Sequence, residues 1–306
     1  KQLEFAGCEI VRVAVPDINA AKVLGEIKKR IKIPIIADIH FNYKLALEAI
    51  KQGVDGLRIN PGNIGAKWKV REVITAAKDR KIPIRIGVNA GSLPKDLIEK
   101  YGHPTHEAMV EAAERHIEIL EELDFHDIKV SLKASDVMKT VEAYRLFSSK
   151  HDYPLHIGIT ETGPVPEGVV KSSIGIGLLL LEGIGDTIRV SLTDSPVVEV
   201  NVAYEILRVT GFREKGVEII SCPTCGRCEV NIKKMVKQVK NALRNVKEPI
   251  KVAVMGCSVN GPGEAKEADF GIAGGKGQGI VFVKGKILKT VKETELVNAL
   301  IEEIRK

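Results

Sequence analysis

Seven short runs rich in Val, Ile and Leu divide the first two thirds of the chain, and stretches with helical spacing separate them. This alternation is typical of βα units, because two parallel strands need a long crossover, usually a helix, between them. The runs are residues 9–15, 34–40, 56–60, 83–89, 127–133, 155–161 and 187–193. They therefore predict an α/β fold with a parallel sheet.

The connecting stretches complete the pattern of a barrel. Residues 105–123, for example, put their apolar side chains on one helical stripe. Seven strands make an awkward barrel, and residues 1–6 look like the last turns of a helix that ends at Gly7. We therefore predict a TIM-type (β/α)8 barrel over residues 1–212, with its first strand absent from this chain.

Six of the runs carry a cationic or imidazole side chain at one register, on the sheet face opposite the Val, Ile and Leu side chains. These residues are Arg12, Arg58, Arg85, Lys129, His156 and Arg189. Unpaired cations inside a barrel are destabilising, so they need carboxylates such as Asp38 and Glu161 or an anionic ligand. A structural ion pair is the alternative for any one of them. Because barrels bind ligands at the C-terminal ends of their strands, we infer a phosphate or diphosphate site.

Composition excludes several classes of protein. The formal charge is +6, but aromatic residues make up only 4% of the chain and do not alternate with basic runs. We therefore expect no nucleic-acid binding, and instead a small anionic ligand or an acidic protein partner. Residues 173–185 form the longest apolar stretch, which is too short and Gly-rich to span a membrane. With no visible secretion signal, a cytoplasmic location is expected.

Four of the five cysteines lie in a second region, for which we predict a separate domain over residues 213–306. Residues 217–221 and 251–255 predict strands, and residues 231–246 predict a basic helix between them. Clustered cysteines in a reducing compartment indicate a metal site. Their spacing offers four thiolates and leaves zinc and an iron–sulfur cluster open: Cys222, Cys225, Cys228 and Cys257. Glu264, on a Gly/Pro-rich loop, is either a further ligand or a solvated acid.

Motifs along essentially the whole chain resemble one enzyme family. In the second region they are Ser221-Cys-Pro-Thr-Cys-Gly-Arg227, Val254-Met-Gly-Cys-Ser-Val-Asn-Gly-Pro-Gly-Glu-Ala265 and Ala268-Asp-Phe-Gly-Ile-Ala-Gly-Gly275. In the first they include Leu57-Arg-Ile-Asn-Pro-Gly-Asn63 and Arg85-Ile-Gly-Val-Asn-Ala-Gly-Ser92. The chain thus resembles the 4-hydroxy-3-methylbut-2-enyl diphosphate synthases, iron–sulfur oxidoreductases of the non-mevalonate isoprenoid pathway.

This resemblance implies a reaction and a cofactor. The reaction is the reductive ring opening of 2-C-methyl-D-erythritol 2,4-cyclodiphosphate, with loss of water, to 4-hydroxy-3-methylbut-2-enyl diphosphate. Two electrons pass through a 4Fe-4S cluster in a small α+β domain similar to a sulfite-reductase half-domain. The implied cluster ligands are Cys222, Cys225, Cys257 and Glu264. Cys228 is then a spectator near the cluster.

The resemblance also implies site residues and partners. Contacts to the substrate are assigned to Arg12, Arg58, Asn60, Arg85, Asn89, Lys133 and Ser191. We expect Glu161 and Glu264 to be catalytic, with Glu161 assisting proton delivery to the leaving hydroxyl; pairing with a neighbouring Arg is the alternative role for Glu161. Ferredoxin or flavodoxin is implied as the electron donor. A homodimer is also implied, in which the cluster domain of one subunit caps the barrel of the other.

Two functions of other classes stay open on the residues alone. One is a metal-stabilised, non-catalytic sensor of a phosphorylated metabolite. The other is a barrel transferase of the pterin-binding type, with a purely structural metal in the second domain. A brown protein with broad visible absorption would exclude the zinc version of either.

Overall fold

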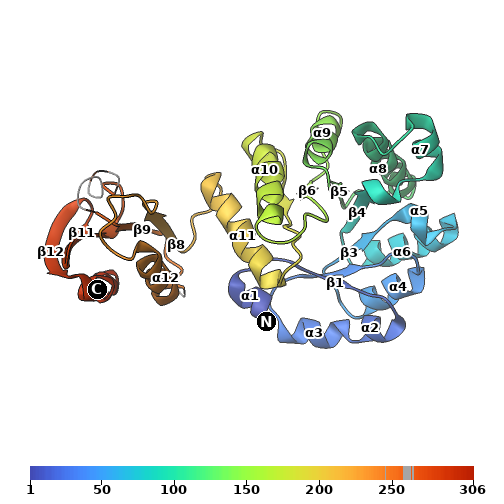
Figure 1. The fold of residues 1–306 in the computed structure, drawn as a ribbon. Coiled ribbons are helices and arrows are strands. Elements are labelled where there is room, and N and C mark those ends of the chain that lie inside the picture. The colour runs from blue at the N-terminus through green and yellow to red at the C-terminus, as the bar shows by residue number, and fades with distance from the viewer. Residues whose placement is uncertain (245, 258–262, 264) are drawn as a thin grey trace. The chain divides into compact units, whose positions relative to one another are not determined.

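The computed structural model describes residues 1–244, 246–257, 263 and 265–306. The chain divides into two compact units, Lys1–Phe212 and Arg213–Lys306 (Figure 1). A cluster of buried apolar residues lies inside each unit. Each unit therefore has a core of its own.

The first unit, all of whose residues are described, contains seven strands, one within each predicted run. They are β1 (Val11–Ala14), β2 (Ile35–Asp38), β3 (Gly56–Ile59), β4 (Ile84–Asn89), β5 (Ile128–Lys133), β6 (His156–Ile157) and β7 (Thr187–Ile188). Strands β1 to β5 form one parallel sheet in sequential order, and β6 pairs in parallel with β7. A parallel bridge between Val130 and Leu155 connects β5 to the β6 segment. The predicted parallel α/β sheet is confirmed.

Helices follow the strands and lie around them (Figure 1). They are α1 (Gln2–Ala6), α2 (Ile18–Lys22), α3 (Leu24–Arg30), α4 (Tyr43–Lys51), α5 (Pro61–Ile64), α6 (Lys67–Asp79), the short 3-10 helix η1 (Ala90–Ser92), α7 (Lys95–Tyr101), α8 (His106–Glu121), α9 (Val137–Ser148), α10 (Glu167–Leu181) and α11 (Pro196–Val209). Several begin at a polar cap, such as Thr105, whose hydroxyl accepts the Ala108 N–H at 3.1 Å. Across the described ranges, no helix is both long and apolar enough to cross a membrane.

The first and last helices of this unit meet. Helix α1 packs against α11, and the Tyr204 hydroxyl donates a hydrogen bond of 2.8 Å to the Gly7 carbonyl. Gly7 ends α1 in the left-handed conformation, with φ of 101°. The helix end predicted at Gly7 is therefore confirmed, and it brings the start of β1 next to α11.

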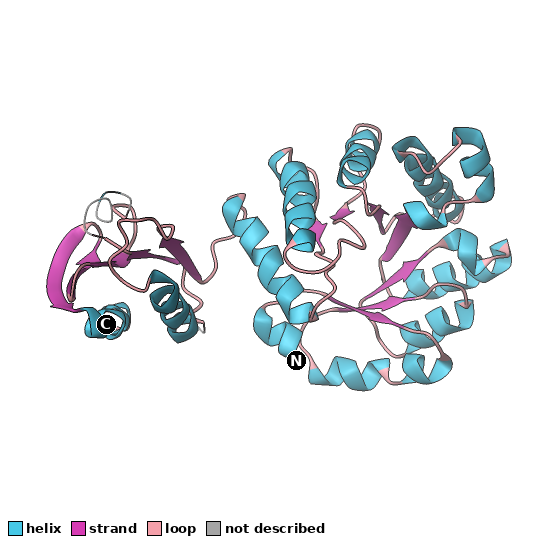
Figure 2. Ribbon diagram, in the orientation of Figure 1, coloured by secondary structure: helices cyan, strands magenta, loops and turns pink. Residues whose placement is uncertain are grey.

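The second unit has a mixed five-stranded sheet in the order β12-β11-β10-β9-β8. Its elements are β8 (Val217–Ser221), α12 (Ile232–Leu243), β9 (Ile250–Met255), β10 (Phe270–Gly274), β11 (Gln278–Val283), β12 (Lys286–Lys292), the 3-10 helix η2 (Glu293–Glu295) and α14 (Leu296–Ile304). Strands β8, β9 and β10 run parallel, whereas β11 is antiparallel to both of its neighbours. Alternate strand residues such as Val252 and Ile272 pack under α12 and α14, which lie on the same side of the sheet (Figure 2).

Candidate active site

A buried ion-pair group lies where β1, β2 and β3 end. Arg12 Nη1 lies 3.0 Å from Asp38 Oδ2, and Arg58 Nη1 lies 3.1 Å from Asp38 Oδ1. Arg58 Nη2 also donates to the Gly87 carbonyl at 3.2 Å. Arg58 and Asp38 are both buried, whereas the Arg12 side chain is 35% exposed. One carboxylate thus holds two guanidinium groups.

Two further cations of the first unit are buried without full compensation. Arg85 is 6% exposed and Lys133 is 3% exposed. Arg85 Nε and Lys133 Nζ are both buried, and neither has a hydrogen-bond partner among the described atoms. Burial, followed by repulsion from Arg12, Arg189 and Arg58, lowers the pKa of Arg85 to about 9. Burial and the neighbouring arginines hold the pKa of Lys133 well below its usual value.

Arg189 joins this group from the β7 side. Its Nε donates to Ser191 Oγ at 3.1 Å, and burial lowers the pKa of Arg189 to about 10. Glu199, in the first turn of α11, attracts Arg189 and Arg12 and accepts the Leu192 N–H at 2.8 Å. Sequence reasoning missed Glu199, although an acid in the first turn of a helix that follows a strand end is a usable signal.

Positive charge is therefore in excess in this region. The described carboxylates that act on it are Asp38 and Glu199, against the five cations Arg12, Arg58, Arg85, Lys133 and Arg189. Of the other two residues at the predicted register, Lys129 is half-buried and interacts with Asp186 and Arg85. His156 lies 2.8 Å (Nδ1) from Thr187 Oγ1, and burial holds its pKa well below the usual value, so it is neutral.

A cavity of about 280 Å³ opens at the C-terminal ends of β4, β5 and β6. It is lined by Asn89, Ala90, Gly91, Ser92, Lys133, Ala134, Ser135, Thr160 and Glu161. Gly158 leaves room for Lys133, because a Cβ there would lie 3.0 Å from Lys133 Nζ and 2.2 Å from the Arg189 carbonyl oxygen. The cavity thus has the buried ammonium group of Lys133 in its wall.

Glu161 is the carboxylate of this cavity. It is exposed and has a φ of 53°, a left-handed backbone conformation that is uncommon for Glu. Among the described residues no ion pair to Glu161 is found, so the alternative of a structural pair with Arg receives no support. Glu161 lines the same cavity as Lys133 and Asn89.

Other predicted residues take local structural roles as well. Asn60 is buried and caps α5, its side chain accepting the Gly62 N–H at 3.1 Å.

Tyr144, which sequence reasoning missed, accepts the Leu132 N–H at 3.0 Å and donates to the His156 carbonyl at 2.7 Å. It therefore ties β5 to β6 behind the cavity, although nothing in the sequence distinguishes it from an ordinary core aromatic residue.

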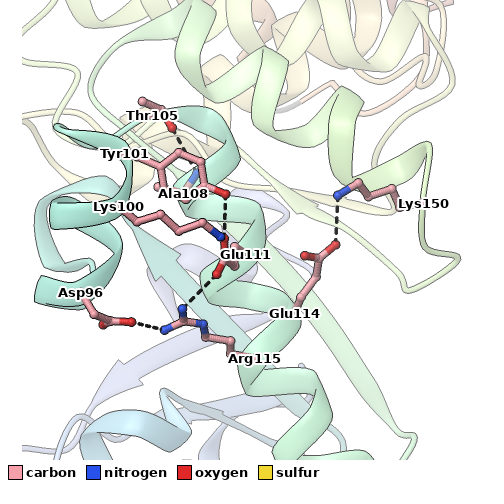
Figure 3. A network of polar contacts seen from close by, with 9 residues as sticks. All are labelled: Asp96, Lys100, Tyr101, Thr105, Ala108, Glu111, Glu114, Arg115 and Lys150. Atoms are coloured by element: carbon pink, nitrogen blue, oxygen red, sulfur yellow. Dashed lines mark hydrogen bonds and ion pairs between the residues drawn. The ribbon is translucent and has the colours of Figure 1, made fainter.

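A network of polar contacts at the surface joins α7 to α8 (Figure 3). The Tyr101 hydroxyl and Lys100 Nζ of α7 both lie 2.6 Å from Glu111 Oε2 of α8. Arg115 Nη2 lies 2.9 Å from Glu111 Oε1, and its Nη1 lies 2.5 Å from Asp96 Oδ2. Helix α7 follows the cavity residues at 89–92 in the chain, and this network joins it to α8.

In the second unit, cysteines follow the C-terminal ends of adjacent parallel strands. Cys222 follows β8, and Cys257 follows β9 after Gly256. Cys222 Sγ accepts the Gly256 N–H at 3.1 Å. A Cβ on Gly256 would lie 3.4 Å from Cys222 Sγ and 2.4 Å from Cys228 Sγ, so both thiols flank this glycine.

The predicted ligand set is only partly gathered. All the cysteines are free thiols; hydrogen bonding by Arg227 lowers the pKa of the exposed Cys225, and Cys228 Sγ donates to the Val230 carbonyl at 3.2 Å. Within the part of the chain that the structure describes, no three His, Cys, Asp or Glu side chains are arranged to hold a metal ion. Glu264 lies outside the described residues.

Comparisons with known proteins cover both units. The GcpE TIM-barrel domain matches residues 1–204, and the GcpE protein C-terminal domain matches residues 218–306. The 4-hydroxy-3-methylbut-2-en-1-yl diphosphate synthase (flavodoxin) of Thermodesulfovibrio yellowstonii is 99% identical over 306 residues, 100% of this chain and 88% of that protein. The protein of the same name from Geobacter sulfurreducens is 59% identical over 304 residues, 99% of this chain and 86% of that protein.

Some solved structures resemble part of this chain. Dihydropteroate synthase of Yersinia pestis shares 13% identity at a TM-score of 0.47, over 69% of this chain and 85% of that chain. At that level the likeness carries no functional argument.

Proposed function

The chain belongs to the GcpE family, and we infer that it makes 4-hydroxy-3-methylbut-2-en-1-yl diphosphate, the product named in its relatives, in isoprenoid biosynthesis. We propose 2-C-methyl-D-erythritol 2,4-cyclodiphosphate as its substrate. Opening that ring takes up two electrons and protons and releases water. The sensor and pterin-type alternatives are not favoured, because relatives matched along the whole chain carry the synthase name.

The uncompensated buried cations of the first unit carry this proposal. Arg85 Nε and Lys133 Nζ are buried donors with no partner among the described atoms. A diphosphate brings negative charge and several acceptor oxygens, and so would satisfy both groups. It would also reverse the fall in their pKa values, because an adjacent anion favours the protonated form.

The proposed contacts follow from that placement. Lys133 and Asn89 line the cavity, while Arg58 and Arg12 approach from the Asp38 side. The substrate-binding residues are proposed to be Arg12, Arg58, Asn60, Arg85, Asn89, Lys133 and Ser191. A ligand spanning these groups would place one phosphate beside Arg85 and the rest of the molecule in the cavity.

We assign proton delivery to Glu161. Glu161 lines the cavity and has no ion-pair partner among the described residues, which supports a role in donating a proton to the leaving hydroxyl. Lys133, in the same wall, would hold the phosphate end and so orient the departing oxygen. Glu161→Gln keeps the shape and removes the proton, which makes it the informative variant.

The second unit is proposed to hold a 4Fe-4S cluster through Cys222, Cys225, Cys257 and Glu264. Free thiols at the ends of two adjacent strands fit this group, because iron–sulfur clusters are held by thiolates at fixed separations. When bound, the cluster supplies electrons one at a time. Cys228 lies beside Gly256 with Cys222 and is the competing thiol. The similarity to a sulfite-reductase half-domain stays a prediction.

The partners are also part of the proposal. Flavodoxin is the donor printed in the names of the relatives, and we propose it for this chain; ferredoxin has no such support. A homodimer, with the cluster unit of one subunit serving the barrel of the other, is proposed from the family resemblance.

Anaerobic turnover tests the function. Iron–sulfur-reconstituted protein, the cyclic diphosphate and reduced methyl viologen should yield the linear diphosphate, detected by mass spectrometry and phosphorus NMR. Glu161→Gln should lose turnover but retain substrate binding. The absence of product from fully reconstituted protein would refute the proposed reaction.

A further inference from the structure

Charge is divided unequally between the two units. Residues 213–306 contain 18 Lys and Arg against 11 Asp and Glu, a formal charge of +7. Residues 1–212 contain 28 against 29, a formal charge of −1. The net positive charge of the chain therefore comes from the second unit.

Much of this charge lies on one helix, α12. Its cationic side chains recur at i, i+4, i+7 and i+11, which places them on one face: Lys233, Lys237, Lys240 and Arg244. The apolar side chains of the helix lie on another face, which is buried in the core of the second unit: Ile232, Met235, Val239 and Leu243. We call the four cationic residues, together with the flanking Lys234, the α12 basic face. All five are exposed, and among the described residues none of them makes an ion pair.

Helix stability accounts for Lys240, in the last turn, but not for the start of this face. Lys233 and Lys234 lie in the first turn, where the helix dipole favours acids, and that turn contains no acidic residue. Like charges three and four residues apart repel one another. These lysines lower the stability of their own helix. Such a cost is expected at a functional site, where another molecule supplies the opposite charge.

The basic face begins at the cysteine end of the sheet. Helix α12 starts at the Asn231 cap, whose side chain accepts the Lys234 N–H at 3.1 Å, three residues after Cys228. Val230 packs on Gly274, where a Cβ would lie 2.4 Å from Val230 Cγ1. Gly274 ends β10, which runs parallel to β9, so the start of α12 lies at the sheet end where Cys222 and Cys257 emerge.

We propose that the α12 basic face is the docking surface for an acidic one-electron donor protein of the flavodoxin type. This inference rests on the proposed function, which requires such a donor. Electron transfer weakens steeply with distance, so a donor must bring its redox group to the cysteine end of the sheet. Complexes of this kind bury little surface and depend on charge to steer their encounter. Helix α12 has no aromatic residue with which to stack bases, which disfavours nucleic acid as the partner.

Charge reversal on this face is the test. In the reconstituted protein with both units present, Lys233→Glu with Lys237→Glu should lower kcat/KM for reduced flavodoxin by about 10-fold or more at low salt. Turnover with reduced methyl viologen and the KM for the cyclic diphosphate should not change. Lys233→Gln with Lys237→Gln should give an intermediate loss, and circular dichroism should show all variants folded.

The matched control lies at the other end of the same sheet. Lys284→Glu with Lys286→Glu, beside the β11–β12 turn, makes the same charge change far along the strands from the cysteines. It should retain kcat/KM for flavodoxin within about threefold, because exposed charges beyond about 10 Å are screened. An equal loss in both double variants would refute a localised docking surface.

Two further outcomes decide the matter. An unchanged kcat/KM for flavodoxin in the α12 variant overturns the proposal. If the wild-type protein does not turn over the cyclic diphosphate with reduced methyl viologen, the proposed function is wrong, but the docking surface is still open to a separate test. Docking is then judged by titrating flavodoxin onto the protein at low ionic strength, where the α12 variant should bind at least about tenfold more weakly than the control.

Discussion

The two units carry positive charge in opposite ways. In the first unit, Arg85 and Lys133 are buried and lack partners for a donor atom among the described groups. In the second, Lys233 and Lys237 are exposed on a helix surface. A buried charge is costly unless an anion meets it at close range, so it indicates a small ligand that enters the barrel. An exposed charge costs little and acts across a wide surface, so it indicates a large partner.

The largest expected effect concerns the thiols, on which the role of the second unit depends. Cys222→Ser and Cys257→Ser should each abolish the broad visible absorption of the reconstituted protein and reduce turnover below detection, because the cluster would lose a thiolate. Cys8→Ser, in the first unit, is the control and should keep both. The iron content of Cys228→Ser distinguishes the two candidate ligand sets. If Cys228→Ser loses iron and Cys257→Ser retains it, Cys228 is a ligand in place of Cys257.

The next effect tests whether the buried charge of Arg85 binds a ligand or stabilises the fold. Arg85→Met should weaken binding of the cyclic diphosphate about 10- to 100-fold, because it removes a charged hydrogen-bond donor. The same change should raise the unfolding free energy of the ligand-free protein by about 1 kcal/mol or more, since an uncompensated buried charge disappears.

Arg58→Met is the comparison for that variant. It should also weaken binding but lower the unfolding free energy by about 1–3 kcal/mol, because Arg58 is paired with Asp38. Calorimetry gives the binding and urea titration the stability. Equal destabilisation by the two variants would show that Arg85 is compensated after all.

A smaller effect follows from the pKa of Arg85, which burial lowers to about 9. Between that pH and the ordinary pKa of arginine, the unfolded chain binds more protons at this group than the folded chain does. The buried charge therefore destabilises the ligand-free fold fully below about pH 9, and this penalty fades as the pH rises from about 9 towards the ordinary pKa of arginine. Binding of the anion needs the protonated form. Each phosphate of the cyclic diphosphate has one ester bond, one anhydride bond and one strongly acidic oxygen, so the ligand does not titrate there. Its Kd should therefore rise above pH 9, by up to about tenfold per pH unit. Arg85→Met should flatten this rise.

The smallest effect concerns the surface network of Glu111. Hydrogen bonds from Lys100 and Tyr101 lower the pKa of Glu111 to about 2, so its contribution to stability is present above pH 4.5 and lost as the pH falls towards 2. Glu111→Gln should lower the unfolding free energy at pH 7 by less than about 1 kcal/mol, as expected for exposed ion pairs. The KM for the cyclic diphosphate should change less than twofold. A large rise in KM would show that α7 positions the cavity wall more tightly than these contacts suggest.

Local features were predictable where the nearest neighbours in sequence decide them. Each predicted run contains a strand, Gly7 ends α1, and α12 lies within the predicted basic helix. Periodicity succeeds in these places because side chains two residues apart share a face of a strand and those three or four apart share a face of a helix. The two shortest strands, β6 and β7, span only the beginning of their runs, which periodicity along the chain did not indicate.

The sequence by itself determined that cations recur on one strand face and that cysteines follow two strand ends. Only the tertiary structure decided that Arg58 shares Asp38 with Arg12, that Arg85 Nε has no hydrogen-bond partner among the described atoms, and that Glu199 attracts Arg189. Likewise, only the fold placed Cys228 beside Gly256. The physical reason is that a repeat fixes the direction of a side chain, whereas the partner it meets depends on which distant segments the packed core brings within a few ångströms.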